Sequence, residues 1–135
     1  MTARFLSLVA LVVGHAFLFV YAWSAVGFPV HLEVASATHS FPLATAAASI
    51  VTALVITLPT AFLAGLVADP RHRYFVVAAF AVAWAVLCLY SFATEAPDGP
   101  WRLIPLMFEL AAISLVGLVF VTLGLKAAAS RRESA

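Results

Sequence analysis

Apolar residues along this chain gather into four long stretches, and the charged residues lie almost entirely between them. The stretches cover residues 5–26, 43–68, 74–94 and 101–125. A helix needs about 20 apolar residues to cross a hydrocarbon core about 30 Å thick, and each stretch reaches that length. None shows the alternation of a membrane β-strand. The pattern predicts an all-α integral membrane protein, with four transmembrane helices in an up-and-down bundle that forms one domain over residues 1–135.

Prolines, glycines and charged residues mark the connections between the stretches. We expect a loop over residues 27–42, a tight turn over 69–73 and a second turn over 95–100, because proline and glycine usually end helices. Residues 126–135 are expected to form a solvated cytoplasmic tail. The first stretch is longer than the roughly 7–15 apolar residues of a signal-peptide core, so we expect a retained helix.

The basic residues predict an orientation. In a four-crossing arrangement one side receives Arg4, Arg71, Arg73, Lys126, Arg131 and Arg132. Arg102, beside Trp101, falls on the other side. Since lysine and arginine in short loops stay in the cytoplasm, both termini are expected to be cytoplasmic. We expect the membrane to be a prokaryotic cytoplasmic (inner) membrane.

Composition supports the membrane assignment and excludes other classes. Hydrophobic residues make up 65% of the chain and charged residues 10%, far from the values of soluble domains. A chain of 135 residues is too small to bury that much apolar surface away from water. The lipid bilayer is therefore the first expected partner. A net charge of +1 gives no basis for nucleic-acid binding. The single cysteine, Cys88, cannot form an intramolecular disulfide and is expected to be a small buried hydrophobe.

Small residues recur at every fourth position of the second stretch. The row consists of Ser49, Ala53, Thr57, Ala61 and Gly65. Helices in lipid associate where small side chains let their backbones approach closely, so this row is a predicted helix-packing face. Two interpretations remain open: packing inside the four-helix bundle, or docking of another membrane subunit or a second copy. A shorter row, Ser7, Ala10 and Gly14, lies on the first stretch. Pro59 frees the Val55 carbonyl, which Thr57 or Thr60 is expected to satisfy.

His15 and Glu109 are the two ionisable residues expected within the hydrocarbon zone. An ionisable group at that depth is costly, and it is therefore a functional candidate. In an up-and-down bundle the first and last helices are neighbours, so His15 and Glu109 are expected at similar depths and close enough to pair. Three interpretations compete: a structural hydrogen bond with Glu109 protonated, a proton or cation step in transport, or a haem or quinone contact through His15.

The connection after the first stretch offers weak metal candidates. If residues 28–34 are extended, His31 and Glu33 lie on one face, with His39 further along. Imidazole and carboxylate ligands suit zinc or copper, but the spacing matches no metal motif, so we expect no metal. Because the chain has no phosphate-binding loop and no catalytic triad, we expect no enzyme activity.

These features give three functional hypotheses. The first is a non-catalytic accessory or scaffold subunit of a larger membrane complex, packed through small-residue helix faces. The second is a small oligomeric proton- or cation-coupled transporter or channel that uses Glu109 and His15. The third is a haem- or quinone-binding membrane anchor of a redox enzyme, although no cofactor is predicted outright.

Overall fold

The computed structural model describes residues 3–94 and 103–134, and within these ranges the regular structure is entirely helical. Four of its helical segments are long and apolar enough to cross a membrane. The elements in chain order are α1 (Ala3–Ala22), the π-helical turn η1 (Trp23–Gly27), α2 (Phe28–Thr38), α3 (Phe41–Val67), the 3-10 turn η2 (Pro70–His72), α4 (Arg73–Thr94) and α5 (Leu103–Glu133). The prediction of an all-helical chain with four membrane-length helices is confirmed.

The expected loop over residues 27–42 is wrong, because most of that segment is helical. α1, η1 and α2 follow one another without a break, so the first helical segment spans Ala3–Thr38. Pro29 does not break it, and the π-helical turn η1 lies just before this proline. Such a turn is one of the local adjustments by which a helix accommodates a proline in its interior. Gly27 lies so close to Thr52 of α3 that a β-carbon on it would overlap the Thr52 hydroxyl. His39, at a φ of 52°, ends α2.

α5 also differs from its predicted bounds. It continues past Leu125 as far as Glu133, so most of the expected tail is helical. The extension contains three consecutive alanines, which favour helix, and Arg131 and Arg132 in its last turn interact well with the helix dipole. The predicted turn over 95–100, and Trp101 and Arg102 beyond it, lie outside the described residues.

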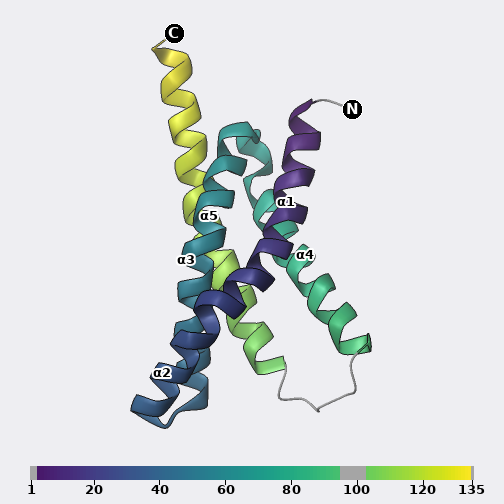
Figure 1. Cartoon of the computed structure of the whole chain (residues 1–135). Helices are drawn as coiled ribbons and strands as arrows, with labels where there is room; N and C mark the ends of the chain where they lie inside the picture. The colour runs from purple at the N-terminus through teal and green to yellow at the C-terminus, as the bar shows by residue number, and fades with distance from the viewer. Residues whose placement is uncertain (1–2, 95–102, 135) are drawn as a thin grey trace.

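The helices pack in an order that the chain order does not predict. α1 packs against α3 and α4, and α5 packs against the same two helices. Going round the bundle the order is therefore α1, α3, α5, α4, and the first and last helices lie diagonally (Figure 1). The expectation that α1 and α5 are neighbours is wrong. Figure 1 also shows both termini and the α3–α4 connection at the same end of the bundle.

The order follows from the close contact between α3 and α5. A β-carbon on Gly65 of α3 would lie 3.0 Å from the Gly124 α-carbon of α5, and one on Gly124 would lie 2.9 Å from the Gly65 α-carbon. The two backbones therefore touch at this crossing, which needs glycine on both sides. Because α5 occupies this smooth face of α3, α4 packs mainly against α5 and α1 instead.

The small-residue row of α3 is buried inside the chain. Ser49, Ala53, Thr57 and Ala61 are each 0% exposed, and Gly65 is buried too. Two other helices cover the row. Thr57 contacts His15 of α1, and Gly65 lies against the backbone of α5. The structure therefore uses this row for packing within the bundle, which leaves no free surface there for a second subunit.

Pro59 lies in α3, but its neighbours behave differently from the expectation. Thr60 donates its hydroxyl to the carbonyls of Ile56, at 2.7 Å, and Thr57, at 3.3 Å. The hydroxyl of Thr57 is instead 2.9 Å from the His15 ring. The prediction that Thr57 or Thr60 bonds the Val55 carbonyl is therefore wrong, because both hydroxyls bond other groups.

Candidate functional site

His15 lies at the centre of the bundle and is completely buried. Its position on α1 turns the ring inward, onto the face that also carries Ala16 and Phe19. The ring nitrogen Nε2 is 2.9 Å from the Thr57 hydroxyl of α3. The other nitrogen, Nδ1, is buried without a hydrogen-bond partner. Since buried polar atoms almost always have a partner, an unpaired ring nitrogen at this position is unusual.

Glu109 is the second ionisable residue inside the bundle, with 5% of its surface exposed. It lies in the first turns of α5 and accepts a hydrogen bond from the Trp84 indole N–H of α4, with Nε1 and Oε2 2.8 Å apart. Trp84 is itself buried. Both partners are thus buried inside the bundle, where polar groups of membrane-length helices usually lie.

Aromatic rings join these two hydrogen-bonded pairs. The His15 ring lies 4.7 Å from the Phe80 ring and 5.7 Å from the Phe19 ring, measured between centroids. Phe19 in turn lies 4.6 Å from Trp84. We call His15, Thr57, Trp84 and Glu109 the polar core. His15 and Glu109 do not bond each other there, because α1 and α5 are diagonal and each residue meets a side chain from an intervening helix.

A line of buried hydroxyls on α3 leads to the polar core. It comprises Thr45, Ser49, Thr52, Thr57 and Thr60, all of them buried. Thr45 and Thr52 donate to carbonyls of their own helix, at 2.9 and 2.8 Å, which leaves their oxygens able to accept. Ser49 has a buried hydroxyl with no partner. The hydroxyl row therefore runs along the inner face of α3, from its N-terminal end to His15.

The weak metal candidates do not come together. Because residues 28–38 are helical rather than extended, His31 and Glu33 point to different sides of α2. His31 Nδ1 is 3.5 Å from the Thr45 hydroxyl, and its ring packs edge-on against Phe41. Glu33 is exposed and His39 caps the helix. Within residues 3–94 and 103–134, no three potential ligands gather as a metal ion would require.

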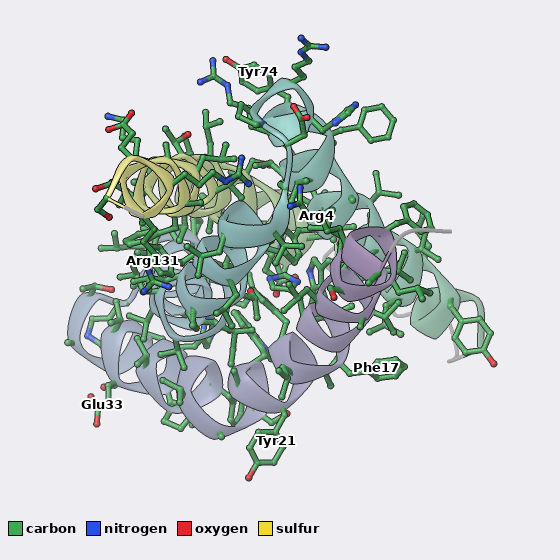
Figure 2. All side chains as sticks on the ribbon, turned by 90° about the horizontal axis from the view of Figure 1, so that it is seen from above. Arg4, Phe17, Tyr21, Glu33, Tyr74 and Arg131 are labelled. Atoms are coloured by element: carbon green, nitrogen blue, oxygen red, sulfur yellow. The ribbon has the colours of Figure 1, made fainter. Side chains whose placement is uncertain are left out.

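Trp84 is the hydrogen-bond partner of Glu109 that the sequence interpretation missed. Figure 2 shows the side chains from the end that carries the termini, with exposed aromatics such as Phe17, Tyr21 and Tyr74 on the periphery. Trp84, by contrast, lies in the middle of α4 and is buried. A buried indole N–H needs an acceptor, and Glu109 is a carboxyl at a comparable depth. That requirement is a signal that the sequence already contains.

The four membrane-length helices indicate a class: an all-helical, multi-pass membrane protein. Comparison with family models, with curated proteins and with solved structures found no match for the chain. Its function is therefore inferred from its own residues.

Proposed function

We propose that this protein is a small proton-coupled transporter or channel in which the polar core carries the proton. The observation behind the proposal is the burial of two ionisable side chains, His15 and Glu109, between the four helices. A charge on such a group at membrane depth costs at least a few kcal/mol, so an ionisable residue there is a functional candidate.

The surroundings of the two groups support this role. The hydroxyl row of α3 supplies acceptors between the N-terminal end of that helix and His15, and His31 contacts its first member, Thr45. His15 keeps one ring nitrogen, Nδ1, without a partner. An imidazole with one bound and one open nitrogen can accept a proton on one side and release it on the other.

Replacing His15 with glutamine tests the proposal. Glutamine can keep a hydrogen bond to Thr57 but cannot exchange a proton at neutral pH, so proton flux is expected to fall by about tenfold or more. The measurement is voltage-driven acidification inside sealed proteoliposomes that contain a pH-sensitive dye. His39→Gln, the same change at an exposed residue, is the control and should conduct like the wild type. Equal flux in the two variants contradicts a role for His15.

The accessory-subunit hypothesis keeps one specific observation in its favour. The long row of α3 is occupied, but the short row on α1 is open: Ser7 and Ala10 are exposed, and a β-carbon on Gly14 would meet nothing within 4 Å. This face suits the close approach of another helix, from a second copy or from a different membrane subunit.

Gly14→Leu separates association from folding. Because the site is open in the single chain, leucine should leave the bundle intact while it blocks close helix contact. Native mass spectrometry of gently solubilised protein is expected to show an oligomer or a complex for the wild type and its loss in the variant. Val20→Leu, at another exposed position of α1, is the control. A wild type that is found solely as a single chain rules out the subunit role.

The orientation is part of the same proposal. We place both termini and the α3–α4 connection in the cytoplasm of a prokaryotic cell, because six of the seven lysines and arginines belong to that end. Arg71 lies within η2 and Arg73 begins α4 at that end, and Arg131 and Arg132 lie in the last turn of α5.

A further inference from the structure

An apolar groove of about 470 Å³ lies between α1 and α4, at the end that carries the termini. Its walls include Leu8 and Val12 of α1 and Val76 and Ala79 of α4. The volume is within the range of about 300–1,000 Å³ that is usual for small-molecule sites. None of the residues of the polar core lines it, so the groove is distinct from the candidate site.

The rim of the groove shows what kind of molecule can cover it. Phe5, Val9 and Val13 of α1 and Phe75 of α4 line the groove and are between 43% and 79% exposed. Membrane helices associate through small residues that allow backbone contact, whereas these bulky side chains would hold a second helix away. A flexible hydrocarbon chain can pass between them and fill the space.

The length of the groove matches one leaflet of a bilayer. Its α1 wall extends from residue 5 to residue 13, which is about 12 Å at the rise of about 1.5 Å per residue. Half of a hydrocarbon core is about 15 Å thick. The groove therefore runs along most of one leaflet, parallel to the helices, in the direction that an acyl chain takes.

The mouth of the groove is polar and mostly basic. Asp69 and His72 line it. Two exposed arginines are next to lining residues in the sequence: Arg4 precedes Phe5, and Arg71 precedes His72. The Asp69 carboxylate already accepts the backbone N–H of Arg71, at 2.9 Å. The guanidinium of Arg73 lies over the Tyr74 ring and donates to its hydroxyl. Arg4 and Arg71 thus leave a net positive charge at headgroup level, which favours an anionic headgroup.

We propose that this groove is a binding site for an anionic phospholipid. One acyl chain lies between α1 and α4, and Arg4 and Arg71 hold the headgroup phosphate at the mouth. The lipid covers apolar surface that none of the described helices covers, and it fixes the ends of α1 and α4 that lie beside the termini relative to each other. The site belongs to the same leaflet as the termini.

Native mass spectrometry of the delipidated full chain tests headgroup selectivity. Phosphatidylglycerol and phosphatidylcholine with identical acyl chains are added separately, and the bound fraction is measured. The wild type should bind phosphatidylglycerol at least about fivefold better than phosphatidylcholine. Arg71→Gln should lower that ratio by roughly fivefold, as expected for the loss of one basic residue near a membrane surface. Arg131→Gln, at the same end but on α5, should keep the preference. Equal binding of the two lipids overturns the proposal.

A pair of adjacent alanines on α4 tests the location. Ala79 lines the groove, whereas Ala78 is exposed next to it. Ala79→Phe should fill the groove and abolish the phosphatidylglycerol adduct, while Ala78→Phe should retain it. If the lipid binds equally to both variants, the groove is not its site. If Ala79→Phe removes a dimer rather than a lipid, a second copy occupies the groove, and the proposal is equally wrong. The headgroup comparison on the wild type applies even if Ala79→Phe fails to fold.

Discussion

Gly65→Ala is expected to destabilise the bundle by about 3 kcal/mol, at the upper end of the usual cost of overpacking. The new β-carbon would overlap the Val121 carbonyl oxygen and lie 3.0 Å from the Gly124 α-carbon. Both obstacles are backbone atoms of α5, so no side chain can rotate to make room. α3 and α5 must therefore separate, and the contact that sets the helix order is lost.

Gly117→Ala is the matched control for this prediction. Gly117 is another buried helical glycine, on α5 rather than α3, but a β-carbon there would meet its nearest atom, Val77 Cγ1, at an ordinary 3.5 Å. This variant should be as stable as the wild type or up to about 1 kcal/mol more stable, because alanine favours helix over glycine. Unfolding by a denaturing detergent in mixed micelles measures both free energies. Equal stability of the two variants would show that α3 and α5 do not touch at Gly65.

Trp84→Phe is expected to destabilise the protein by about 1–3 kcal/mol, because it leaves the buried Glu109 without its donor. Trp84 Nε1 and Glu109 Oε2 are 2.8 Å apart, and both side chains are buried. Phenylalanine retains an aromatic ring against Phe19 but has no N–H. The same unfolding measurement in mixed micelles gives the free energy.

A double-mutant cycle isolates this hydrogen bond from the loss of ring size. Trp84→Phe and Glu109→Leu are made singly and together, and their effects should differ from additivity by about 1–3 kcal/mol, since the two residues are in direct contact. Trp23→Phe, at a half-buried tryptophan of η1, should add to Glu109→Leu without coupling. Additive effects of Trp84→Phe and Glu109→Leu would mean that the bond contributes nothing.

The hydropathy pattern predicted the helical elements because each long apolar stretch can satisfy its backbone in lipid only as a helix. It missed the continuation of the first helix to Thr38, since proline and glycine near residue 28 usually end helices. In this chain Gly27 is held by contact with Thr52, a residue far away in the sequence. A local pattern does not contain such a contact.

The sequence pattern did not predict the helix order either, because that order also depends on contacts between residues far apart in the chain. All four stretches carry small residues, and only three-dimensional packing decides that Gly65 meets Gly124. The ionisable residues of the site were found because such residues are rare in apolar stretches. Their partners were not, because Thr57 and Trp84 become partners through the order α1, α3, α5, α4, which differs from the order in the chain.

The most direct test of the proposed function is proton flux through sealed proteoliposomes that contain Glu109→Gln. Glutamine is nearly isosteric and can still accept the Trp84 hydrogen bond, but it cannot bind and release a proton. Flux is expected to fall by about a hundredfold, as for the loss of a proton-transferring group. Glu33→Gln, the same change at an exposed position of α2, should keep wild-type flux. A wild type that conducts no more than empty liposomes, or a Glu109→Gln variant that conducts like Glu33→Gln, contradicts a proton-carrying role for the polar core.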